Sequence, residues 1–83
     1  MAEVGIVMYG TSWCGDCARA RHFFDEYGVA YVEIDVDEDG DAAVLVKQMN
    51  GGDRRVPTIV FPDGSVLVEP SWVQLAEKTG VEL

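Results

Sequence analysis

The sequence predicts an α/β fold, a four-stranded mixed sheet flanked by three helices. Short apolar runs typical of strands alternate with amphipathic segments typical of helices, and glycine or proline stands at most of the boundaries. The chain has 83 residues, enough for one domain, and 48% of them are hydrophobic, enough for a packed core. We therefore expect a single domain over residues 1–83.

The first part of the chain predicts a strand, a helix and a second strand. Residues 6–9 (IVMY) form an apolar run before Gly10, which is typical of a buried strand. Over 15–27 the apolar residues are spaced by three or four, which predicts a helix that ends at Gly28. Residues 29–36 (VAYVEIDV) alternate between apolar and polar, as in a strand. A right-handed crossover makes these two strands parallel.

Residues 42–49 predict a second helix, preceded by a turn at 37–41 whose carboxylates can cap it. The glycine-containing loop 50–53 (NGGD) ends this helix. Its expected core positions are Ala43, Val44, Val46 and Met49.

The C-terminal part predicts a hairpin and a last helix. Strands at 57–61 and 66–68 are joined by a tight turn at 62–65 (PDGS), which makes them antiparallel. Ser71 follows a proline and can cap the last helix. The side chains of that helix that are expected to face the core are Trp72, Leu75 and Ala76.

The chain is strongly acidic, with a formal net charge of −9 and acidic residues concentrated in 33–41. Nucleic acids and anionic membranes bind basic surfaces, so neither is an expected partner. We interpret the acidic stretch as a solvated loop and helix N-terminus, because it fits no EF-hand pattern. Residues 1–5 do not resemble a signal peptide, and no apolar segment approaches the roughly 20 residues of a membrane span. We therefore expect a cytoplasmic monomer.

Cys14 and Cys17 are separated by two residues and stand between a predicted strand and helix. A bridge between them would close a loop too small to stabilise the fold much, whereas a CxxC pair in this position is typical of a redox dithiol. At the helix N-terminus, unpaired N–H groups and the helix dipole stabilise a thiolate, the form that attacks disulfides. We assign Cys14 as the nucleophile and Cys17, one turn later, as the resolving thiol.

The charged neighbours of the pair act in opposite directions. Asp16 disfavours a thiolate at Cys14, whereas Arg19 and Arg55 are candidates to offset it, and the balance between them stays open at this stage. A structural zinc site is disfavoured because it needs four ligands and only His22 could add to the cysteines. We expect no bound metal.

Val56 and Pro57 stand at the start of a predicted strand, after a glycine-containing loop. A cis bond at this proline would turn the Val56 backbone outward as an unpaired strand edge, although trans is the commoner isomer. Trp13 adjoins the proposed nucleophile and is interpreted as part of a docking surface.

The runs TSWCGDC (11–17), RVPT (55–58) and FPDG (61–64) resemble those of glutaredoxins and glutaredoxin-like proteins of the thioredoxin superfamily. The resemblance covers nearly the whole chain and implies a thioredoxin/glutaredoxin-like fold. It implies a cis proline at Pro57, and a Val56 backbone that binds the substrate. The substrate-binding surface implied in this way consists of Thr11, Trp13, Gly15, Asp16, Arg55, Val56, Pro57, Ser71 and Trp72.

Two stretches depart from the typical glutaredoxin pattern. Gly15 and Asp16 replace the usual Pro-Tyr pair between the cysteines. Residues 69–72 (EPSW) stand where typical members carry two glycines and an acidic residue, which hold the γ-glutamyl end of glutathione. The WCG start, the NGG loop at 50–52 and the Pro-Ser start of the last helix are most similar to mycoredoxins, which reduce mixed disulfides formed with mycothiol.

The resemblance implies a disulfide reductase of the glutaredoxin/mycoredoxin type, without a tightly bound cofactor and with mycothiol or glutathione as reductant. Its expected partners are disulfide-bearing proteins, the small thiol, and a thioredoxin or mycothiol reductase. Arginines near the site of an anionic protein suggest a small anionic thiol or a basic patch on the target. Three alternatives stay open: an electron donor reduced by thioredoxin reductase, an iron–sulfur carrier in which two protomers each supply Cys14, and a non-catalytic binding module that would not need Cys14.

Overall fold

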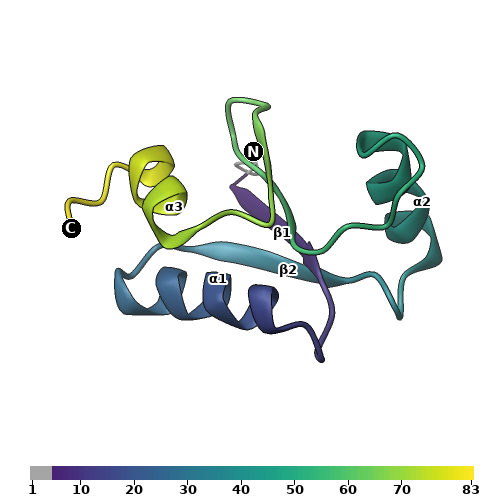
Figure 1. The fold of residues 1–83 in the computed structure, drawn as a ribbon, viewed down its shortest axis with the longest axis horizontal. Helices are drawn as coiled ribbons and strands as arrows, with labels where there is room; N and C mark the ends of the chain where they lie inside the picture. Colours follow the sequence, from purple (N-terminus) through teal and green to yellow (C-terminus); the bar gives the residue numbers. More distant parts are fainter. Residues whose placement is uncertain (1–4) are drawn as a thin grey trace.

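The computed structural model describes residues 5–83 and confirms the predicted architecture (Figure 1). One mixed sheet has the strand order β2–β1–β3–β4. β1 is parallel to β2 and antiparallel to β3, and β3 is antiparallel to β4. In chain order the elements are β1 (Ile6–Gly10), α1 (Gly15–Glu26), β2 (Tyr31–Asp35), α2 (Gly40–Met49), β3 (Thr58–Val60), β4 (Val66–Val68) and α3 (Trp72–Thr79).

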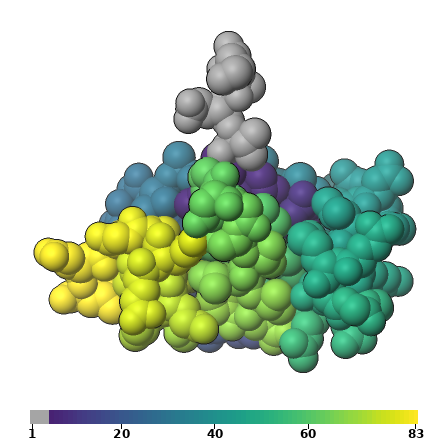
Figure 2. Space-filling model, turned by 90° about the horizontal axis from the view of Figure 1, so that it is seen from above, coloured from purple at the N-terminus to yellow at the C-terminus, as the bar shows by residue number. Residues whose placement is uncertain are grey.

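Helices cover both faces of the sheet. α1 and α3 pack on one face, and α2 lies apart from them at the other end of the molecule in Figure 1. Figure 2 shows the β3–β4 hairpin between α2 and the α3 segment. The larger core, between the sheet and the helices α1 and α3, consists of Ile6, Met8, Ala20, Phe23, Phe24, Ile59, Phe61, Leu75 and Ala76. A smaller cluster under α2 consists of Val36, Ala42 and Val46.

The ends of the helices are set by side-chain caps and by glycine. Asp39 caps α2 by accepting the N–H of Ala42 at 3.0 Å, so the helix begins two residues earlier than predicted. Ser71 caps α3 as predicted, in a reciprocal capping box with Gln74. After α1 the chain reverses at Gly28, whose φ of 64° favours glycine.

Three sequence-based predictions need correction. The strand predicted over 29–36 spans only Tyr31–Asp35, because the N–H of Val29 still bonds to the end of α1. The strand predicted over 57–61 is likewise shorter, at Thr58–Val60. Val44 was predicted in the core but is 55% exposed, since Ala42 and Val46, one turn apart, define the buried face of α2. Within residues 5–83 no helix is both long enough and apolar enough to cross a membrane.

Candidate active site

Cys14 lies at the end of the loop that joins the central strand β1 to α1, and Cys17 lies in the first turn of that helix. Cys14 is the N-cap of α1, and its Sγ accepts the backbone N–H of Cys17 at 3.2 Å. Cys14 is half-buried, whereas Cys17 is fully buried, and no disulfide joins the two thiols. The Cys14 sulfur therefore lies at the helix start, where the first backbone N–H groups of α1 have no partner within the helix.

The Cys14 thiol also contacts the backbone that precedes Pro57. Its Sγ–H donates to the carbonyl oxygen of Val56 at 3.6 Å. The Val56–Pro57 peptide bond is cis, as the resemblance implies, and Pro57 is buried. The structure therefore brings together the two motifs that lie about 40 positions apart in the sequence.

Gly10 is required where the end of β1 passes the Cys17 thiol. A Cβ added to this residue would lie 2.9 Å from Sγ of Cys17 and 3.4 Å from a carboxylate oxygen of Glu33. The absence of a side chain thus lets the strand approach Cys17 closely and fixes the depth at which that sulfur lies.

Burial raises the pKa of the Cys17 thiol to about 12, and its hydrogen bond with Cys14 acts in the same direction. The hydrogen bond with the Thr11 backbone and the charge of Arg21 lower the pKa of Cys17, but by less than burial raises it. The folded state holds the Cys17 proton more tightly than the unfolded chain does. This difference stabilises the fold fully at pH values below the ordinary thiol pKa. The stabilisation is lost as the pH rises towards 12.

We predict that iodoacetamide at pH 7 alkylates Cys14 at least about tenfold faster than Cys17 in the folded, reduced protein. Burial and protonation both protect Cys17, whereas the half-buried Cys14 is accessible. Mass spectrometry of tryptic peptides measures the two rates, and alkylation in urea provides the control in which they converge. Equal rates in the folded protein would contradict the assignment of the two roles.

An ion pair below the dithiol fastens α1 to β2. The Arg21 guanidinium donates to both oxygens of Glu33 at 2.7 and 2.8 Å, which raises the pKa of Arg21, and also to the carbonyl of Thr11 at 2.7 Å. Arg21 thereby holds the start of the loop that leads to Cys14. The Thr11 hydroxyl itself is buried, and its oxygen has no hydrogen-bond partner among residues 5–83.

Trp13 projects from the site and is held by its indole nitrogen. The ring is 71% exposed, and its Nε1–H donates to Asp37 at 2.8 Å. Arg54 pairs with the other oxygen of the same carboxylate. The contacts with Arg54 and Trp13 hold the pKa of Asp37 below its ordinary value. Three loops are therefore joined around an exposed aromatic surface.

Two further ion pairs involve residues close in sequence to Cys17 and to Val56. Arg19 pairs with Asp16 at 3.2 Å and also donates to the carbonyl of Pro70 at 3.4 Å. Arg55 pairs with Glu69 at 3.7 Å rather than with Asp16. Of the two arginines expected to offset the charge of Asp16, the structure thus places only Arg19 beside that carboxylate.

The remaining predicted site residues lie around these groups. Gly15 is exposed at the first position of α1. The Ser71 hydroxyl accepts the Gln74 N–H at 3.1 Å and is engaged in the cap of α3. Trp72 is half-buried, with its ring 5.0 Å from that of Phe23 and 5.6 Å from that of His22. Among residues 5–83 no three His, Cys, Asp or Glu side chains are grouped closely enough to hold a metal ion.

Sequence reasoning missed three charged residues of the site. Asp37 was interpreted only as part of a solvated stretch, Arg54 was assigned no role, and Glu69 was considered only as part of the stretch 69–72 that replaces the usual glycines. The sole signal in the sequence is the opposite charge of residues in different loops, which does not say which of them pair.

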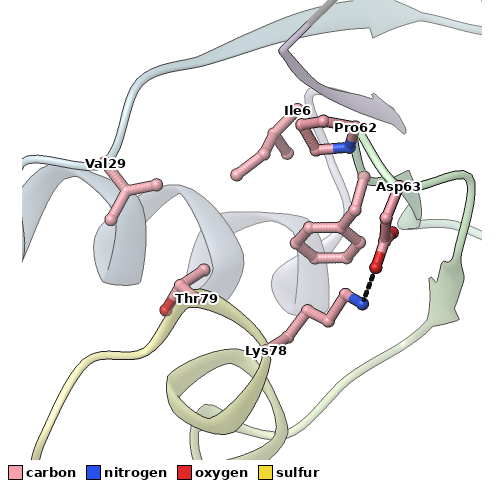
Figure 3. Close-up of a pocket in the computed structure, with 7 residues that line it drawn as sticks. Ile6, Val29, Pro62, Asp63, Lys78 and Thr79 are labelled. Atoms are coloured by element: carbon pink, nitrogen blue, oxygen red, sulfur yellow. Dashed lines mark hydrogen bonds and ion pairs between the residues drawn. The ribbon is translucent and has the colours of Figure 1, made fainter.

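A separate cavity of about 330 Å³ lies away from the cysteines (Figure 3). It opens near Ile6, at the start of β1, whereas Cys14 follows the other end of that strand. Figure 3 shows Lys78 directed at the carboxylate of Asp63, and their ion pair measures 2.6 Å. The cavity lining contains neither cysteine, so it is not part of the candidate active site.

A dithiol at the start of α1, next to a cis proline that precedes the neighbouring strand of a mixed four-stranded sheet, defines the thioredoxin/glutaredoxin-like class of redox proteins. The family model described as glutaredoxin matches residues 6–67, and the chain belongs to the glutaredoxin family.

Known relatives agree with this assignment. A Mycobacterium tuberculosis protein named as a glutaredoxin is 42% identical over 71 residues, which cover 86% of this chain and 84% of the relative. Mycoredoxin 1 of Corynebacterium glutamicum is 36% identical over 73 residues, 88% of this chain and 90% of the relative. The crystal structure of an Archaeoglobus fulgidus glutaredoxin superposes with a TM-score of 0.75 at 29% identity, covering 93% of this chain and 85% of that one.

Proposed function

We propose that the protein is a thiol–disulfide oxidoreductase that reduces protein disulfides, or mixed disulfides between a protein and a small thiol. The observation that carries the proposal is the position of the Cys14 sulfur. It lies between the Cys17 N–H at 3.2 Å and the Val56 carbonyl at 3.6 Å, with its partner thiol buried behind it. The Cys14 sulfur thus has an N–H donor that can stabilise a thiolate, a backbone segment beside it that can bind a substrate, and a second thiol one helical turn away.

In the proposed reaction the Cys14 thiolate attacks one sulfur of the substrate disulfide. A mixed disulfide forms with Cys14, and the other substrate sulfur leaves as a thiolate. Cys17 then loses its proton, which the departing thiolate or water accepts, and attacks Cys14 Sγ. The Cys14–Cys17 disulfide forms and the second substrate thiol is released, so two electrons pass from the protein to the substrate. The Val56 backbone would pair with an extended substrate segment beside Cys14.

Two molecules of a small thiol would return the protein to its dithiol form and would leave as their own disulfide. The 36% identity with mycoredoxin 1 supports mycothiol for this role, with glutathione as the alternative. Because free dithiols persist in reducing compartments, we place the activity in the cytoplasm, and we propose that one 83-residue domain performs it as a monomer.

NADPH-coupled reduction of a mixed disulfide tests the proposal in three parallel assays. One contains mycothiol with its reductase, the second glutathione with its reductase, and the third thioredoxin reductase alone. Turnover with one small thiol supports the proposal and identifies the reductant. Turnover only with thioredoxin reductase would place the protein among electron donors, and silence in all three assays would refute a reductase function.

Cys17→Ser is expected to separate the two kinds of substrate. Reduction of a protein–small-thiol mixed disulfide is expected to keep more than about a tenth of its rate, because the small thiol can attack the Cys14 mixed disulfide directly. Reduction of an intramolecular protein disulfide, measured with insulin, is expected to fall at least about 100-fold, because no resolving thiol remains. Loss of both activities with an intact fold would mean that Cys17 also serves the first step.

A further inference from the structure

Glu69 adopts a backbone conformation that side chains normally avoid. It follows β4, and its N–H donates to the Pro57 carbonyl at 2.9 Å, which places it beside the cis proline of the site. Among residues 5–83 it is the only non-glycine with a positive φ, at 50°. Glycine adopts this conformation without a steric penalty, so the backbone alone gives no reason for a glutamate here. The side chain therefore needs an explanation of its own.

The Glu69 carboxylate lies 3.7 Å from the guanidinium of Arg55, and both side chains are exposed. Arg55 immediately precedes Val56, whose carbonyl contacts the Cys14 thiol at 3.6 Å. The pair thus lies on the rim that a molecule attached to Cys14 must cross. An exposed pair of this kind is weak in itself but determines the local charge.

The other arginines around Cys14 are also paired. Arg19 is held by Asp16 and Arg54 by Asp37, and the chain as a whole carries a formal net charge of −9. An anionic group that reached the rim would have to displace a carboxylate before it could pair with an arginine. The surrounding negative potential would also lower its local concentration.

We propose that Glu69 is a specificity-determining residue that selects against small thiols with free carboxylates and so favours a thiol with an uncharged body. It acts in two ways: it occupies Arg55, and it adds its own negative charge next to the Val56–Pro57 segment that contacts the Cys14 sulfur. This inference rests on the proposed function and deepens it. The sequence-based expectation was an anionic thiol, because several arginines lie near the site. The proposal is the opposite, because each of these arginines is paired with a carboxylate.

Two mixed disulfides of one neutral cysteine peptide test the proposal, one with glutathione and one with 2-mercaptoethanol, and dithiothreitol regenerates the protein in both. Glu69→Gln is expected to raise kcat/KM for the glutathione substrate about fivefold, the effect of one unit charge at close range in water. The 2-mercaptoethanol substrate is expected to change less than about twofold, and the gain is expected to shrink in 0.5 M salt.

Two further variants sharpen the test. Glu26→Gln removes the same charge at the far end of α1, about 18 Å along a helix of 12 residues, and is expected to leave both substrates unchanged. Adding Arg55→Gln to Glu69→Gln is expected to cancel part of the gain, because the released arginine is lost.

The outcomes distinguish this inference from the proposed function. Equal effects of Glu69→Gln on the two substrates, or an equal gain from Glu26→Gln, would overturn the inference and leave the reductase function standing. If wild-type protein reduced neither substrate, the proposed function would fail and the specificity argument with it.

Discussion

Cys14→Ser is expected to lower disulfide reductase activity at least about 1,000-fold, to the uncatalysed background, in every coupled assay. A serine oxygen cannot form the disulfide intermediate on which both proposed steps depend. The fold is expected to survive, because serine is a good N-cap and the side chain at this position caps α1 through the Cys17 N–H. Turnover and thermal unfolding, measured on the same sample, separate loss of chemistry from loss of structure.

Cys14→Ala provides the matched variant, since it also removes the cap. Its activity is expected to equal that of Cys14→Ser, whereas its unfolding free energy is expected to be lower by about 1 kcal/mol. A residual rate above a tenth of wild type in Cys14→Ser would show that Cys14 is not the nucleophile.

Phe23→Ala is expected to lower the free energy of unfolding by about 3–5 kcal/mol. Phe23 is fully buried, and its ring lies 4.9 Å from Tyr27, 5.0 Å from Trp72 and 5.9 Å from Phe24. It therefore joins α1 to α3 through an aromatic cluster. Small domains have roughly 5–15 kcal/mol of total stability, so this loss would leave little of it. Urea unfolding followed by circular dichroism measures the change.

Val44→Ala is the control for this experiment. Its side chain is 55% exposed on α2, so truncation is expected to cost less than about 0.5 kcal/mol. Comparable losses for the two variants would mean that the sequence-based placement of Val44 in the core was right after all. They would also mean that α2 is packed differently.

The fold was predictable because each element carries its own local signal. The apolar run of β1 and the glycines after the helices specify element type and order without long-range information. Boundaries were less accurate because several neighbouring residues can perform the same task. Four carboxylates between residues 37 and 41 could cap α2, and only packing selects Asp39. The error at Val44 has a similar origin, since in so short a helix the sequence does not determine which face is buried.

The position of the two cysteines at the start of α1 was predictable for the same local reason, but the pairing of the charges around them was not. The CxxC pair stands at a strand–helix boundary that the sequence shows directly. By contrast, Asp37 contacts Trp13 across 24 positions and Arg54 across 17, and such pairs follow only from the folded loops. The sequence-based expectation of an anionic substrate therefore took account of the arginines but not of the carboxylates that pair with them.

The contact between Cys14 and Val56 has a consequence for how the sequence of this protein can change in evolution. The sulfurs come from the first crossover unit of the chain, whereas Val56, Pro57 and Glu69 come from the later hairpin and its flanks. The CxxC pair and the Val56–Pro57 segment thus come from separate parts of the chain, and the Cys14 sulfur meets the Val56 carbonyl at 3.6 Å. Under the proposed function, a change near the hairpin would alter which disulfide is accepted and leave the CxxC pair unchanged, so new partners would not require a new nucleophile.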